Sequence, residues 1–100
     1  MKMIVVRVKL QINEHDKDTL LACLKGQMDE ISRFKGCKDY SFYQDPLDPS
    51  RFFLYEEWLD RPSFDAYKRS KEFQETSALL FPMMVQKPDS AYYSSEKVGP

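Results

Sequence analysis

Two hydrophobic periods follow one another in the first third of the chain. From Ile4 to Ile12 every even position is apolar, whereas the odd positions from Arg7 onward are charged or polar. This alternation predicts a strand with one face packed on a core. Apolar residues then recur at helical spacing from Leu20 to Ile31, which predicts a helix of roughly five turns that ends before Gly36.

The middle of the chain predicts a hairpin of two aromatic strands. Residues 39–44 and 51–58 are rich in phenylalanine and tyrosine, which favour strands. Between them, residues 45–50 contain two aspartates and two prolines, which is a strong turn signal. Two such runs joined by so short a loop are typical of neighbouring antiparallel strands.

The last third predicts an interrupted helix and a final strand. Helical spacing begins after Asp60, which can cap a helix, and it stops at Pro82, with a break expected near Ser70. A short strand is expected around residues 91–93. The resulting order is strand, helix, strand, strand, helix, strand. It predicts an α+β fold with ferredoxin-like split βαβ topology (β-α-β-β-α-β) and an antiparallel sheet.

A sheet of this topology has helices on one face only. The open face is expected to contain alternate residues of the second aromatic strand: Phe52, Leu54, Glu56 and Trp58. Such an aromatic face is not expected to stay exposed in solution, so either a second copy or a ligand should cover it. We therefore expect a homodimer packed through the sheet faces.

Composition narrows the class of protein and of partner. A chain of 100 residues with 42% hydrophobic content can form one domain, which we expect over residues 1–95 with a loose tail at residues 96–100. Lys and Arg number 15 against 16 Asp and Glu, without a basic block, so nucleic acid is not an expected partner. No apolar run approaches the roughly 18 residues of a membrane span. We expect no membrane partner and a cytoplasmic protein.

The cysteines and the lone histidine do not suggest a metal or redox centre. Cys23 and Cys37 lie fourteen positions apart and suit a reducing compartment as ordinary thiols. His15 is the only histidine and lies in a polar turn without companion ligands. No metal site is therefore expected. The charged run 65–75 is interpreted as a solvated helix face.

Several short motifs, in this order and spacing, resemble the antibiotic biosynthesis monooxygenase domain family. They are Phe34-Lys35-Gly36-Cys37, Tyr40, Asp45-Pro46, Leu54-Tyr55-Glu56-Glu57-Trp58-Leu59-Asp60, Ser63-Phe64 and Ser70-Lys71-Glu72-Phe73. The resemblance spans residues 4–93 and implies a dimeric α/β barrel. It also implies one of several activities, which include cofactor-free oxidation of quinols and polycyclic phenols, haem degradation and processing of a small signalling sugar.

The resemblance carries over to individual positions only in part. Trp58 corresponds to the tryptophan of members that oxidise polycyclic phenols without a metal or flavin, but Leu54 and Phe64 replace their amide and tyrosine. Haem-degrading members would have their haem-ligating histidine at about Ser77, so no haem or other cofactor is expected. Tyr67 stands where many other members carry a histidine.

A cofactor-free monooxygenase, one of the activities that the resemblance implies, needs an apolar cavity that holds an electron-rich phenol. Its flat apolar wall would be Trp58 with Phe42, Phe52 and Leu54, and Phe64 is a further substrate-binding candidate. A plainer interpretation is that Trp58 only packs at the sheet and dimer face.

Proton transfer in such a cavity needs a base and a group that stabilises an oxyanion. Glu56 is the candidate base, because it shares a strand face with the tryptophan two residues later and burial would raise its pKa. Arg7 is the candidate oxyanion partner, and Tyr40 and Tyr67 are candidate donors to a carbonyl. Alternatively, Glu56 and Arg7 form an ion pair across neighbouring strands.

Three functions fit this set of residues. The first is a cofactor-independent monooxygenase that oxidises a quinol or polycyclic phenol. The second is an isomerase or lyase that acts on a small oxygenated metabolite by acid and base chemistry alone. The third is a dimeric domain that binds a small molecule without catalysis.

Overall fold

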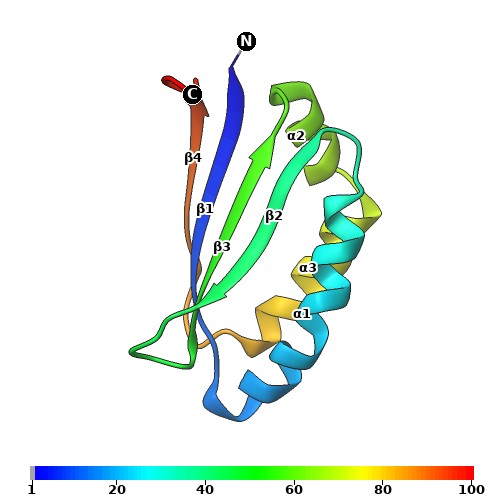
Figure 1. Cartoon of the computed structure of the whole chain (residues 1–100). Coiled ribbons are helices and arrows are strands. Elements are labelled where there is room, and N and C mark those ends of the chain that lie inside the picture. The colour runs from blue at the N-terminus through cyan, green and yellow to red at the C-terminus, as the bar shows by residue number, and fades with distance from the viewer. Residues whose placement is uncertain (1) are drawn as a thin grey trace.

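The computed structural model describes residues 2–100 as one antiparallel sheet with helices packed on one face (Figure 1). The strand order in the sheet is β2-β3-β1-β4, with β1 and β3 in the centre. The ferredoxin-like split βαβ prediction is therefore confirmed. The elements are β1 Met3–Gln11, η1 Glu14–Asp16, α1 Lys17–Ser32, β2 Cys37–Gln44, β3 Arg51–Trp58, α2 Arg61–Lys68, α3 Lys71–Leu80, η2 Phe81–Met83 and β4 Asp89–Ser95.

The break predicted near Ser70 separates α2 from α3. Each of the two helices has its own N-cap: Asp60 Oδ1 accepts a hydrogen bond from the Ser63 amide at 2.9 Å, and Ser70 Oγ accepts one from the Phe73 amide at 3.1 Å. The Ser70 hydroxyl also donates to the carbonyl of Tyr67 at 2.6 Å, at the end of α2. One serine thus ends one helix and begins the next.

Gly36 sets the close approach between the start of β2 and the start of α2. Its φ of 88° lies in the left-handed region that favours glycine. A Cβ at this position would collide with the side chain of Ser63. The Gly36 carbonyl accepts a hydrogen bond from the Leu59 amide at 2.8 Å, which holds the end of β3 against the same turn.

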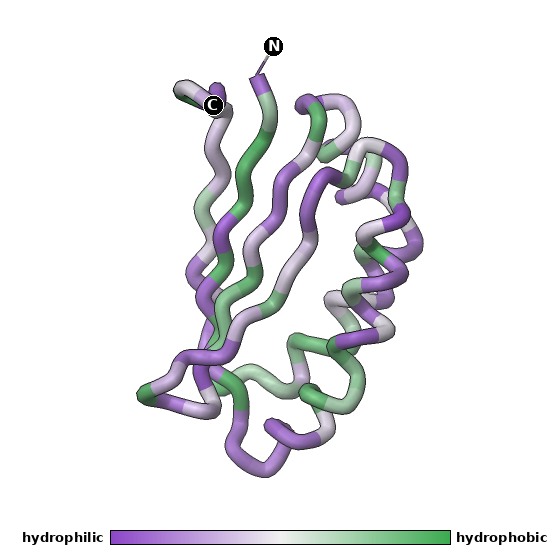
Figure 2. Tube along the Cα trace, viewed as in Figure 1, coloured by the Kyte–Doolittle hydropathy of each residue, from purple (hydrophilic) through white to green (hydrophobic). Residues whose placement is uncertain are grey.

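The core lies between the sheet and the helices. The prediction that alternate residues of the second aromatic strand lie on the open face of the sheet is therefore wrong. Phe52, Leu54, Glu56 and Trp58 face the helices and not the open side of the sheet, and all four are buried within a single chain. They join the even positions of β1 there, because Val6 pairs with Glu56 in the register of the two strands. Figure 2 shows the alternation of hydrophobic and hydrophilic positions along these strands.

The open face of the sheet is formed by the odd positions of β1 and β3. Arg7 pairs with Tyr55 across these two strands and lies beside Ala91 of β4. The strand β4 contains the predicted residues 91–93 and extends two residues further at each end. None of the helices within residues 2–100 is long and apolar enough to cross a membrane.

Candidate active site

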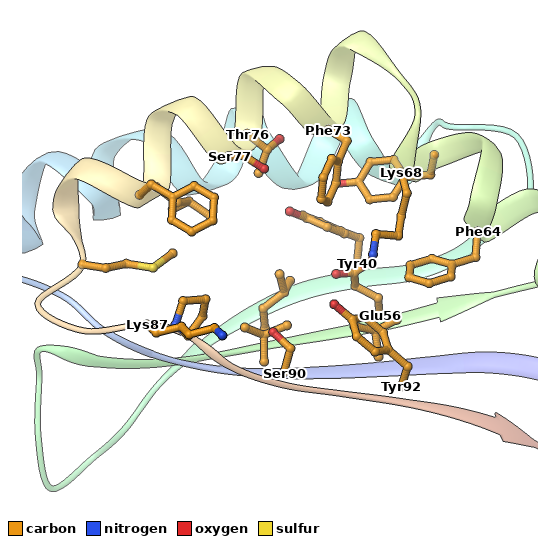
Figure 3. Close-up of a pocket in the computed structure, with 18 residues that line it drawn as sticks. Tyr40, Glu56, Phe64, Lys68, Phe73, Thr76, Ser77, Lys87, Ser90 and Tyr92 are labelled. Carbon is orange, nitrogen blue, oxygen red and sulfur yellow. The ribbon is translucent and has the colours of Figure 1, made fainter.

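A cavity of about 400 Å³ opens between the sheet and the C-terminal helices (Figure 3). Its floor comes from β1, β2 and β3, its roof from α2 and α3, and its side from η2 and β4. This volume lies within the range typical of small-molecule sites. The lining residues are Val6, Val8, Tyr40, Leu54, Glu56, Phe64, Tyr67, Lys68, Phe73, Thr76, Ser77, Leu80, Phe81, Met84, Lys87, Pro88, Ser90 and Tyr92.

Glu56 is the only carboxylic acid in the lining, and it is 5% exposed. Burial raises its pKa from 4.5 to about 7, because a charged carboxylate is poorly solvated there. The hydrogen bond that Trp58 Nε1 donates to Glu56 Oε1, at 2.9 Å, opposes this rise, as does the positive charge of Lys68. The carboxyl group can therefore exchange a proton near neutral pH.

Trp58 supports the site from behind the cavity wall. Its side chain is fully buried and does not line the cavity. Its ring stacks on Tyr67 with centroids 4.7 Å apart and planes at 22°, and Phe34 meets both rings edge-on. Trp58 thus orients Glu56 by its N–H group and Tyr67 by its ring.

Two tyrosines bring hydroxyl groups to the cavity. The hydroxyl of Tyr40 is buried and has no hydrogen-bond partner among residues 2–100 that meets ordinary geometry. Burial raises the pKa of both Tyr40 and Tyr67, and the nearby Glu56 charge adds to it, so both remain protonated donors at neutral pH. An unpaired buried hydroxyl is costly, which makes Tyr40 a natural partner for a polar ligand atom.

Lys68 brings a positive charge to the same end of the cavity, at the C-terminus of α2. Its ammonium lies 5.7 Å from the ring centre of Phe64, 6.0 Å from that of Phe73 and 5.1 Å from that of Tyr92. Figure 3 shows its nitrogen directed towards the region of Tyr40 and Glu56. The aromatic rings therefore hold a cation beside the buried acid.

The predicted site residues divide into three groups. Tyr40, Leu54, Glu56, Phe64 and Tyr67 line the cavity together. Phe42, Phe52 and Trp58 belong to the hydrophobic core and do not line it. Arg7 forms the third group by itself.

The prediction that Arg7 shares this cavity is wrong. Arg7 lies at an odd position of β1, on the opposite face of the sheet, where its Nη2 donates to Tyr93 Oη at 3.4 Å. Direct partners across a sheet share a face, and the partner of Glu56 on β1 is Val6. An ion pair between Arg7 and Glu56 is excluded for the same reason.

Several residues that close the cavity were not predicted as site residues. Lys68 belongs to the charged run that was interpreted as a solvated helix face, and Tyr92 belongs to an exposed edge strand. The spacing of Phe64 and Lys68, four residues apart in α2, was an available signal that both lie on one helix face. No comparable signal places Lys87 or Ser90 at the cavity.

Residues 2–100 contain no cluster of three or more histidine, cysteine, aspartate or glutamate side chains arranged to hold a metal ion. Both cysteines are free thiols, and burial raises the pKa of Cys37 to about 11. Cys37 is thus a weak nucleophile at neutral pH.

Comparison with known proteins relates both the sequence and the fold to one family. Residues 3–79 match the sequence model of the antibiotic biosynthesis monooxygenase family. The uncharacterized protein sll1783 of Synechocystis is 26% identical over 72 residues, which are 72% of this chain and 49% of that protein. The chain thus spans about half the length of this relative.

Solved structures repeat the fold over nearly the whole chain. A conserved protein from Methanosarcina mazei superposes with a TM-score of 0.87 at 28% identity, covering 96% of this chain and 95% of its own. A solved antibiotic biosynthesis monooxygenase superposes with a TM-score of 0.79 at 22% identity, covering 96% of this chain and 99% of its own. At that identity the second likeness concerns the fold alone.

Proposed function

Because the chain belongs to the antibiotic biosynthesis monooxygenase family, we propose that it is a cofactor-independent monooxygenase acting on a quinol or polycyclic phenol in the cavity described above. The observation that carries this proposal is the buried Glu56, the single acid of an apolar cavity, with a pKa near 7. A base with this pKa can accept a proton at neutral pH and return it later.

The first step is removal of a proton from the substrate by the Glu56 carboxylate. The Lys68 ammonium and the Tyr40 hydroxyl stabilise the substrate oxyanion that forms. Lys68 thus has the role that the sequence predicted for Arg7. The electron-rich anion then reacts with dioxygen. For an anthrone, the ring CH₂ group becomes a carbonyl with one atom of dioxygen, and the other atom leaves with both hydrogens as water.

The apolar lining contributes by excluding water from the anion. Val6, Val8 and Leu54 form the floor, and Phe73 and Leu80 cover it from α3. In such surroundings the charges of Lys68 and of the substrate oxyanion interact more strongly than in water.

We further propose that two copies pack through the open faces of their sheets. That face includes the half-buried apolar residues Met3, Val5, Phe53 and Tyr55. It lies opposite the cavity, so each copy would keep its own entrance. The cytoplasm is the compartment we propose, where the free thiols remain reduced.

Oxygen consumption tests the proposed reaction. Purified protein is mixed with a panel of hydroquinones and anthrones, and the uptake of dioxygen and the formation of quinone are followed together. We expect Glu56→Gln to lower the rate by about 100-fold or more, because the amide cannot accept the proton. Glu75→Gln, which removes an exposed carboxylate of α3, serves as the matched control. No uptake on any substrate, or equal rates in both variants, would contradict the proposal.

An isomerase is the second candidate function, and one observation favours it. A buried acid with a pKa near 7, beside two protonated tyrosines, is also suited to move a proton next to a carbonyl group. Such a reaction consumes no dioxygen. Anaerobic incubation of hydroxy-ketones in D₂O, with deuterium incorporation followed by NMR, would identify it. A ligand that binds and is recovered unchanged from both experiments would indicate a binding domain.

A further inference from the structure

The cavity has a second cationic end that the proposed reaction does not use. Lys87 and Pro88 line it from the segment that joins η2 to β4, together with Ser90 of β4. In Figure 3, Lys87 lies beside Ser90, at the end of the cavity away from Lys68 and Phe64. A proline restricts the backbone of the residue before it, which limits the directions open to the Lys87 side chain.

The charges of the lining do not balance. Two lysines, Lys68 and Lys87, stand against the single carboxyl of Glu56. The positive charge of Lys68 lowers the pKa of Glu56, which places this lysine at the end of the cavity near the acid. Within residues 2–100, none of the ion pairs within 4.0 Å includes Lys68 or Lys87. The cavity therefore has a positive charge in excess, at the end opposite the acid.

The unpaired hydroxyl of Tyr40 is an independent sign that a ligand completes this site. Tyr40 is 3% exposed and lines the cavity, and its buried hydroxyl has no hydrogen-bond partner of ordinary geometry among residues 2–100. A ligand oxygen at this point would satisfy it. The two features together describe a molecule with two separate polar ends joined by an apolar body.

We propose that the ligand of this cavity is a flat polycyclic acid, with a ring carbonyl or hydroxyl oxygen bound by Tyr40 and a carboxylate bound by Lys87. The inference rests on the proposed function, from which it takes both this cavity as the substrate site and the polycyclic body of the ligand. Tyr40 would fix the reacting ring beside Glu56, and Lys87 would fix the direction in which the molecule enters.

Binding of three related probes tests both ends separately. Anthraquinone-2-carboxylate has both polar groups, its carboxamide lacks the charge, and anthracene-2-carboxylate lacks the ring carbonyls. Affinities are measured by isothermal titration calorimetry at low ionic strength. We expect the quinone acid to bind about tenfold more tightly than its amide. Lys87→Met should abolish this preference, Lys87→Arg should retain it, and Lys35→Met, outside the cavity, should leave it unchanged.

The other end is tested by Tyr40→Phe. This variant should weaken both quinone probes by about fivefold and leave anthracene-2-carboxylate unaffected, because only the quinones have an oxygen for the hydroxyl. Folding is not at issue, since the variant removes an unpaired buried hydroxyl.

Failure of this inference can be told apart from failure of the proposed reaction. The quinone probes are already oxidised, so their binding does not depend on turnover. Equal affinity for acid and amide, or a preference that survives Lys87→Met, would overturn the inference even where neutral anthrones are oxidised. Preferential acid binding that depends on Lys87, without oxygen uptake, would support the inference and contradict the monooxygenase.

Discussion

Replacement of Glu56 by glutamine should change how the stability of the protein depends on pH. An ordinary, solvated glutamate has a pKa of 4.5, which represents the unfolded chain, whereas the pKa of Glu56 in the folded protein is about 7. Between these values the folded state keeps the proton that the unfolded state has released. The slope of stability against pH is therefore negative in this window: stabilisation is complete below the unfolded pKa and is lost as pH rises to the folded one.

The size of the effect follows from the difference of about 2.5 between the two pKa values. Each pH unit corresponds to about 1.4 kcal/mol, so ionisation of this group costs the folded state about 3 kcal/mol above neutral pH. Glutamine does not titrate, and its amide oxygen can still accept the Trp58 hydrogen bond. Relative to the wild type, Glu56→Gln should gain about 2 to 3 kcal/mol in unfolding free energy between about pH 5 and about pH 8.

Urea unfolding at a series of pH values measures this difference. Trp58 is the only tryptophan, so its fluorescence reports on the environment of Glu56 itself. The protein concentration is held constant, because dimer formation would add to apparent stability. Glu75→Gln shows what removal of an exposed carboxylate does. A free-energy difference between Glu56→Gln and the wild type that stays constant with pH would refute the burial argument, as would an equal gain in the control.

Three further results are expected. Trp58→Phe removes a hydrogen bond that lowers the pKa of Glu56, so the acid limb of the kcat/KM profile against pH should move to higher pH. The variant should also lose about 2 kcal/mol of stability. An acid limb that does not move would show that Trp58 has no influence on the pKa of the base. Gly36→Ala should lose about 2 kcal/mol or more in urea unfolding, because Cβ meets Ser63 at a positive φ, whereas Gly26→Ala, in an open part of α1, should gain up to about 1 kcal/mol; equal effects would contradict this reasoning. Light scattering should give the mass of two chains, and a monomer at micromolar concentration would exclude the dimer.

The order of elements could be predicted because each one has a local cause. Alternation predicted β1, and the break expected near Ser70 is where α2 ends and α3 begins; in the structure the Ser70 hydroxyl caps α3 by accepting a hydrogen bond from the Phe73 amide. Alternation also showed that Phe52, Leu54, Glu56 and Trp58 share a face. It did not show which face, since that depends on the side from which the helices pack, and helix packing is set by the whole chain.

The site was only partly predictable, because the cavity depends on strand register and on distant segments. The partner of Glu56 on β1 is Val6 and not Arg7, a difference of one residue that exchanges the two faces of the sheet. Tyr92 meets Lys68 across 24 positions of sequence, through the edge strand β4. A charged residue near the end of a short helix gives no sign in the sequence that three rings will surround it.

Alternation along β3 also has a consequence for how this fold can acquire new chemistry. Glu56 and Glu57 are neighbours in sequence and lie on opposite faces of the sheet. Glu56 is buried beside the cavity, whereas Glu57 accepts a hydrogen bond from the Tyr55 hydroxyl on the open face. Changes at Leu54 and Glu56 alter the lining of the cavity, and changes at the odd positions alter the surface proposed for assembly. The cavity lining and this surface can therefore be varied independently, although the residues that control them are neighbours in sequence.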